Sequence, residues 1–200
     1  MKKTLMLSLF ALAASMMLNA QQNVVWQDDF SSDKGWQTFE FKREGKAEYT
    51  KDEKFLLKCE LEGINHGYIS KCKTTLNASK NFIIKVDAES RSGLKDDSYF
   101  GIVFNYLDSK NYMCFVVEKG FAYFIEFKQG DLVRYDYDIV KKTKAKTFEL
   151  QLKKIGNTVT FIINDEDALE IEKVDVITNK IGLCVLGKTQ VAFDNMKILQ

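Results

Sequence analysis

The sequence predicts an all-β protein built from antiparallel strands. Apolar residues recur at every second position along many short segments, the pattern of strands that turn one face to a core. Short clusters of Gly, Asn, Asp and Ser separate these segments at the spacing of hairpins. Since no segment has the pattern of an amphipathic helix, we expect roughly a dozen strands in a sandwich or barrel.

The first residues have the pattern of a secretory signal peptide. Two lysines precede an apolar run over residues 5–18, and Asn19-Ala20 leads into polar residues. The run is shorter than the roughly 20 residues that a bilayer-spanning helix needs. We therefore predict a signal peptide over residues 1–20 and an exported, soluble protein, periplasmic or extracellular. Residues 21–200 then form one domain.

The charge balance limits the partners. The chain has 29 basic and 28 acidic residues and a formal net charge of +1. Because the two signs are interspersed, no cationic surface is expected to bind nucleic acid or an anionic bilayer. No second apolar segment is long enough to insert into a membrane. The oligomeric state stays open.

The strands in the middle of the chain alternate most cleanly. Residues 98–107, 121–127 and 131–138 are expected to form long strands in the centre of a sheet. If their polar residues face solvent, Tyr135 and Tyr137 belong to the core. Glu170-Ile171-Glu172 follows a hairpin signal and is typical of a charged edge strand, which discourages pairing between molecules.

The cysteines form two pairs by environment. If residues 54–74 form a hairpin around His66, Cys59 lies opposite Cys72 and Glu60 opposite Lys71, with complementary charges across the strands. We predict a Cys59–Cys72 disulfide, which an exported protein can keep. Cys114 and Cys184 lie in apolar strands and are expected to remain buried, reduced thiols.

Four segments together resemble a known family. They are "DDFSSDKGW", "YFGIVFNYLDSKNYMCFVVEKGFAYFIEF", "GNTVTFIINDEDALEIE" and "IGLCVLGKTQVAFDNMKI". Their layout is similar to that of the concanavalin A-like lectin and glucanase jelly rolls, which include laminin G-like modules, and especially to stand-alone versions secreted by Bacteroidetes. The resemblance covers the whole chain after the signal peptide and implies a two-sheet jelly-roll sandwich.

The closing strand has a specific place in this architecture. The first and last strands lie side by side, and the break in alternation between Phe193 and Met196 predicts a bulge. Asp194 is then near Asp29, and carboxylates on adjoining terminal strands hold a structural calcium ion in several jelly-roll modules. The alternative is that Asp194 and Asn195 bind neighbouring backbone N–H groups. No other cofactor is expected.

The family includes enzymes, but their carboxylate pattern is missing. Related glucanases place the pattern Glu-x-Asp-x-x-Glu, or a one-residue variant of it, on one strand, and the nearest approach here is the segment 170–175. The single histidine, His66, is explained by a tight loop. Catalysis is therefore not the first expectation.

Carbohydrate binding is the function that the resemblance favours. Lectin sites combine aromatic rings with side chains that form several hydrogen bonds to hydroxyl groups. The central strands offer such polar and aromatic side chains, and we predict as ligand-binding residues Tyr99, Asn105, Glu126, Arg134 and Asp136. Three functions stay open: a secreted, non-catalytic, lectin-like module that binds a glycan or polysaccharide, a glycoside hydrolase, and a structural or protein-interaction module.

Overall fold

A computed structural model describes residues 23–63, 66–93, 95–140 and 146–200. The predicted signal peptide, residues 1–20, lies outside these residues. Within them all regular structure is strand, which confirms the all-β prediction. This described part of the chain has no helix long and apolar enough to cross a membrane.

Sheet A has nine strands. Their bounds are β1 Val24–Asp28, β2 Phe39–Phe41, β3 Gly45–Tyr49, β4 Phe55–Cys59, β6 Phe82–Ser90, β11 Thr147–Ile155, β12 Thr158–Ile163, β13 Glu166–Ile171 and β15 Thr189–Leu199. The spatial order is β13-β12-β11-β6-β15-β4-β3-β2, and β1 pairs with the other end of β15.

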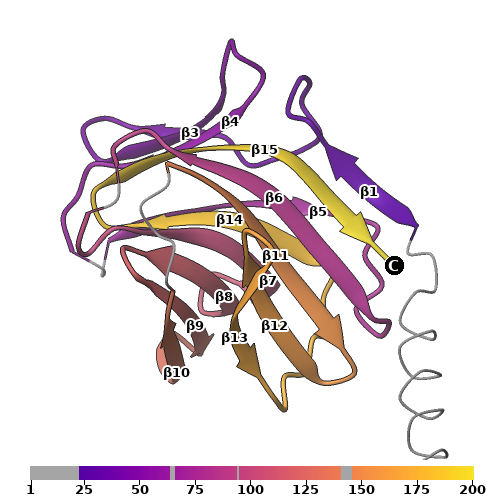
Figure 1. Cartoon of the computed structure of the whole chain (residues 1–200). Helices are drawn as coiled ribbons and strands as arrows, with labels where there is room; N and C mark the ends of the chain where they lie inside the picture. Colours follow the sequence, from indigo (N-terminus) through magenta and orange to yellow (C-terminus); the bar gives the residue numbers. More distant parts are fainter. Residues whose placement is uncertain (1–22, 64–65, 94, 141–145) are drawn as a thin grey trace, which may run out of the picture.

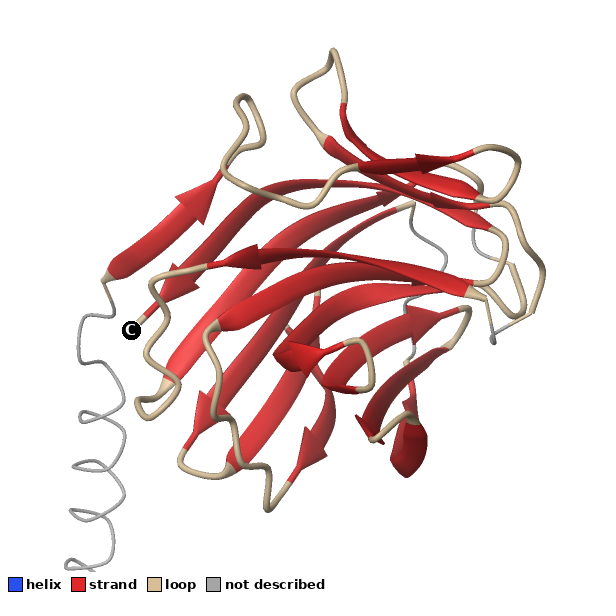
Figure 2. Ribbon diagram, turned by 180° about the vertical axis from the view of Figure 1, so that it is seen from behind, coloured by secondary structure: helices blue, strands red, loops and turns tan. Residues whose placement is uncertain are grey.

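Sheet B has six strands. They are β5 Gly67–Lys73, β7 Tyr99–Asp108, β8 Asn111–Glu118, β9 Phe121–Lys128, β10 Asp131–Ile139 and β14 Lys180–Leu186. The order is β10-β9-β8-β7-β14-β5, with antiparallel pairing throughout. Figures 1 and 2 show the two sheets as layers of a sandwich, which confirms the predicted architecture.

The core fills the space between the sheets. Every second residue of the central strands is buried there, as in β6, whose exposure alternates over its whole length. Phenylalanines supply much of the volume, and Phe115 of sheet B stacks on Phe161 of sheet A with ring centroids 4.9 Å apart. Burying each such ring contributes about 1.5–3 kcal/mol relative to leaving it exposed.

The first and last strands lie side by side in sheet A, as predicted, but β15 lies inside the sheet, between β6 and β4, and does not close it. Asp28 lies opposite Met196, and Figure 1 shows β1 beside the end of β15. The pairing of β15 with β6 shifts register between Asp194 and Lys197, and Asn195 has a φ of 51°. This bulge confirms the interpretation of the broken alternation.

The predicted Cys59–Cys72 disulfide is wrong. β4, which ends at Cys59, pairs with β3 and β15 in sheet A, whereas β5, which carries Cys72, pairs with β14 in sheet B. The chain therefore changes sheets where a hairpin was expected. Cys59 and Cys72 are free, as are Cys114 and Cys184, and all four thiols are buried.

The structure reverses one expectation about strand position and confirms another. β10 lies at an edge of sheet B and not in its centre. β13, which carries Glu170, lies at an edge of sheet A, as its charges indicated. The reason is topological, because the chain turns back from β9 to add β10 on the outside.

Candidate functional site

The outer face of sheet B, which points away from the core, is unusually apolar. Val103, Cys114, Val116, Ile125 and Cys184 form a second hydrophobic cluster there, each at most 3% exposed. An antiparallel sheet with one face on a core normally carries polar residues on the other face. This outer face therefore has the composition of a surface that is covered or that binds something.

Tyrosines surround this cluster. Tyr99 and Tyr123 are largely buried, whereas Tyr135 and Tyr137 on β10 are 44% and 60% exposed. The ring of Tyr123 lies 5.4 Å from that of Tyr99, 5.5 Å from that of Tyr135 and 5.9 Å from that of Tyr137. The expectation that Tyr135 and Tyr137 belong to the core is wrong, since both pair across β9 with outward-facing residues.

A buried carboxylate orients these rings. Glu118 accepts a hydrogen bond of 2.7 Å from the Tyr123 hydroxyl and one of 2.8 Å from the backbone N–H of Asp97. Burial, and then the negative charge of Glu118, raise the pKa of Tyr99 to about 12. Burial likewise raises the pKa of Tyr123, so the hydroxyls of Tyr99 and Tyr123 keep their protons, and Glu118 fixes the position of the Tyr123 hydroxyl.

Beside the tyrosines the outer face is hollowed into a trough of about 390 Å³. Its walls and floor come from all strands of sheet B except β7, and they are Gly67, Ile69, Tyr112, Cys114, Ile125, Phe127, Leu132, Tyr135, Cys184 and Leu186. None of these side chains carries a formal charge at neutral pH.

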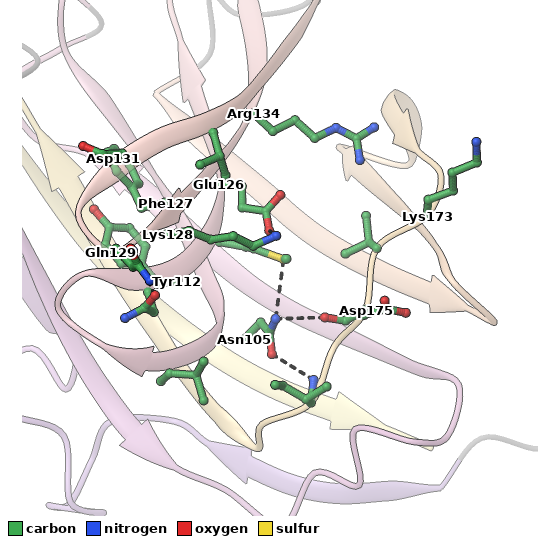
Figure 3. Close-up of a pocket in the computed structure, with 16 residues that line it drawn as sticks. Asn105, Tyr112, Glu126, Phe127, Lys128, Gln129, Asp131, Arg134, Lys173 and Asp175 are labelled. Atoms are coloured by element: carbon green, nitrogen blue, oxygen red, sulfur yellow. Dashed lines mark hydrogen bonds and ion pairs between the residues drawn. The ribbon is translucent and has the colours of Figure 1, made fainter.

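A second, polar hollow of about 650 Å³ lies at one end of the sandwich. It opens between the ends of β8, β9 and β10 and the segment 173–177, which leads from β13 to β14 (Figure 3). We call it the end hollow. Its charged side chains are Glu126, Lys128, Asp131, Arg134, Lys173 and Asp175. Tyr112 and Phe127, with ring centroids 4.9 Å apart, line both the end hollow and the trough.

Glu126 is the most buried of these charged residues, at 8% exposure. Its carboxylate forms an ion pair of 2.9 Å with the ammonium group of Lys128, whose side chain is 65% exposed. An ion pair with such an exposed partner is weak, because solvent screens it. A buried carboxylate gains most from firm hydrogen-bond donors, so Glu126 is suited to accept hydrogen bonds from a ligand.

Arg134 lies next to Glu126 across β9 and β10. Its Nε donates to Asp136 at 2.8 Å, and its Nη1 donates to the backbone carbonyl of Glu172 at 3.1 Å. The guanidinium also lies 5.4 Å from the ring centre of Phe124. These contacts fix its plane and tie β10 to the segment beyond β13.

Asn105 builds the wall of the end hollow. Its Nδ2 donates to the carbonyl of Asp175 at 2.9 Å, and its Oδ1 accepts from the N–H of Ile177 at 2.8 Å (Figure 3). Its φ of 49° belongs to an irregular stretch of β7. Because the amide is used in this way, Asn105 positions the segment 173–177 and is not free to contact a ligand through both of its polar atoms.

The structure brings part of the predicted site together. Asn105, Glu126 and Arg134 line the end hollow, and Asp136 lies outside it but holds Arg134. Tyr99 is on the outer face of sheet B instead. The sequence reasoning missed Lys173 and Asp175, because only the folded chain brings the link between β13 and β14 beside β10.

The aspartates predicted to bind calcium do not form a metal site. In the described ranges no group of three or more His, Cys, Asp or Glu side chains could hold a metal ion. Asp29 accepts hydrogen bonds from Ser31, and Asp194 accepts one of 2.7 Å from the N–H of Asn195. The alternative of local backbone bonds therefore describes Asp194. Of the two N-terminal aspartates it is Asp28, not Asp29, that is buried.

Comparison with known proteins supports the fold. No protein-family model matches this sequence, and no curated protein matches it. Among solved structures, a protein of unknown function with a galectin-like fold from Bacillus subtilis has a TM-score of 0.66 at 13% identity, covering 90% of this chain and 98% of that one.

Two further structures have named activities. The carbohydrate binding module CBM66 from Bacillus subtilis has a TM-score of 0.59 at 14% identity, covering 83% of this chain and 96% of the module. The β-glucanase of Bacillus licheniformis has a TM-score of 0.61 at 9% identity, covering 90% and 99%. The chain thus has the galectin-like, jelly-roll β-sandwich fold. At these identities the likeness establishes the fold alone.

Proposed function

We propose that this chain is an exported, non-catalytic carbohydrate-binding module and that the end hollow is its sugar site. One observation carries the proposal. The end hollow combines a nearly buried carboxylate, Glu126, and an oriented guanidinium, Arg134, with the rings of Tyr112 and Phe127.

This combination matches the chemistry of a sugar. Hydroxyl groups can donate to Glu126 and accept from Arg134 or Lys173, while the C–H faces of the sugar ring pack on an aromatic side chain. The walls are held in place, since Asn105 bonds the segment 173–177 and Arg134 bonds the carbonyl of Glu172. A site of this kind needs several polar groups at fixed spacing.

Two further observations support the proposal. Sandwiches of this shape include a protein named as a carbohydrate binding module. The N-terminal sequence favours export, which would bring the protein to glycans outside the cytoplasm. The acidic strand β13, by contrast, has the position of a structural edge, since it pairs only with β12 and its Glu170 is exposed.

A glycan array, screened with and without calcium, would identify the ligand. Its strongest oligosaccharide is then titrated calorimetrically against variants. Glu126→Gln and Arg134→Ala should each weaken binding more than tenfold, over ~1.4 kcal/mol, because each removes charge-assisted hydrogen bonds. The double variant Glu170→Ala/Glu172→Ala, which changes acidic residues outside the hollow, serves as the control and should bind normally.

Other results would favour the alternatives. Loss of affinity in the Glu170/Glu172 variant, with normal binding by the Glu126 and Arg134 variants, would refute this site. Release of reducing sugar from the ligand would indicate a glycoside hydrolase. Binding to no glycan on the array would favour a structural or protein-interaction module.

A further inference from the structure

The trough on the outer face of sheet B differs chemically from the neighbouring end hollow. The end hollow has six charged side chains, whereas those of the trough are aliphatic, aromatic or thiol groups. Its polar side-chain groups are two tyrosine hydroxyls and two thiols, and the backbone groups of the inner strands β8, β9 and β14 are occupied in strand pairing. Sugar hydroxyls placed over this floor would lose hydrogen bonds to water and regain few.

We infer that the trough binds a single unbranched alkyl or acyl chain. The inference does not depend on sugar binding in the end hollow, because it is carried by a different set of contacts. The chain would lie over Cys114, Ile125 and Cys184 and pack between the walls formed by Ile69 and Phe127 and the rim formed by Leu132 and Tyr135.

The shape of the trough favours a thin occupant. Cys114, Ile125 and Cys184 are 2%, 3% and 1% exposed, whereas Leu132 and Tyr135 at the rim are 56% and 44% exposed. The floor side chains are therefore almost covered by their neighbours, and most of the apolar surface that an occupant would contact belongs to the walls and the rim. A stable interface with a second protein buries about 800 Å² per partner, while 390 Å³ is within the usual range of small-molecule pockets.

The floor also stays uncharged. The thiol of Cys184 beside it, together with burial, raises the pKa of Cys114 well above its ordinary value. Cys184 directs its own thiol to the carbonyl of Gly101 at 3.8 Å. A thiol that keeps its proton behaves as a small apolar group, so Cys114 is suited to contact with methylene groups.

Straight-chain alkanols from hexanol to decanol test the inference directly. They are neutral and contain no sugar, so a failed sugar site leaves their result standing, and a failed trough leaves the sugar result standing. In calorimetric titrations affinity should rise about three- to fourfold per added methylene group, from ~0.8 kcal/mol each. An affinity that does not change with chain length would overturn the inference.

Variants on β10 locate the binding. Leu132→Lys and Tyr135→Ala alter the rim of the trough and should each weaken decanol binding at least tenfold. Ile139→Lys is the matched control, because Ile139 is 67% exposed on the same strand and does not line the trough. Circular dichroism melting verifies that all three fold. Equal losses in Leu132→Lys and Ile139→Lys, or none in either, would show that decanol binds elsewhere.

Discussion

Two adjacent aspartates, Asp28 and Asp29, differ sharply in burial and in the hydrogen bonds that they accept. Asp28 is 1% exposed, and its carboxylate accepts hydrogen bonds from the N–H of Phe30 at 2.8 Å and from the indole N–H of Trp36 at 2.9 Å. The ammonium group of Lys34 lies 3.8 Å away. Asp29 is exposed and bonds only locally, to Ser31. The first of the pair thus anchors the N-terminal segment to the core.

Replacing Asp28 by Ala should lower the free energy of unfolding by about 2–3 kcal/mol, because it leaves the Trp36 and Phe30 donors buried without acceptors. Urea unfolding monitored by tryptophan fluorescence measures the change. Asp29→Ala is the matched control, and its midpoint should stay close to that of the wild type. Similar midpoints for both variants would mean that Asp28 is not the anchor.

The shielded hydroxyl of Tyr99 predicts a pH dependence of stability. Its pKa is raised to about 12 in the folded protein, first by burial and then by Glu118, against roughly 10 in an unfolded chain. Between these values the folded state keeps a proton that the unfolded state has lost. This contribution is therefore complete below pH ~10 and is lost as the pH rises towards 12.

Tyr99→Phe removes that contribution. Its free energy of unfolding, measured in urea at a series of pH values from about 9 to 11.5, should fall less steeply than that of the wild type. Identical slopes would show that the Tyr99 hydroxyl titrates alike in both states.

Among the elements, β15 must pair with strands on both of its sides and also bury side chains on both sides of a break in its alternation. It pairs with β6 along most of its length and must also pair with β1 and β4. The bulge at Asn195 makes this compatible with burying both Phe193 and Met196. Asn tolerates a positive φ, and its amide donates to Asp87 at 2.9 Å.

Two substitutions at Asn195 separate the strain from the hydrogen bond. Both Asn195→Val and Asn195→Gly lose the bond to Asp87, but only Val resists a φ of 51°. Asn195→Val should therefore be less stable than Asn195→Gly by about 1–2 kcal/mol in urea unfolding. If the two variants are equally stable, the bulge does not require a left-handed residue.

At the scale of the whole molecule, the two sheets share one core. Cys59 lies in that core on sheet A, whereas Cys114 lies on the outer face of sheet B, and each thiol is buried. Burial raises the pKa of Cys59 and, to about 11, that of Cys72. Thiolate, the species that reacts with alkylating agents, is therefore scarce in the folded protein.

Alkylation should report cooperative unfolding of the whole sandwich. In urea without a reductant, all four cysteines should react, and Cys59 and Cys114 should be labelled at the same urea concentration. Mass spectrometry of proteolytic fragments measures each site. Labelling of Cys59 at a much lower urea concentration than Cys114 would show that the sheets unfold separately. If two cysteines stay unlabelled in urea, they form a disulfide, contrary to the structure.

Local patterns were sufficient for the fold class. The period of two, the turn residues and the charges of β13 are short-range properties, so they predicted the strands, the acidic edge and the bulge near Asn195. The broken alternation after Phe193 was visible because a bulge changes which neighbours face the core.

Only the tertiary structure decided which strands become neighbours. Between Cys59 and Cys72 the chain crosses from one sheet to the other, and nothing local distinguishes that crossing from a hairpin. The alternation in an edge strand also does not tell which of its two faces meets the core. On the edge strand β10, Tyr135 and Tyr137 are on the outward face. The end hollow depends on Lys173 and Asp175 lining the same space as Glu126, an approach of distant segments that periodicity cannot predict.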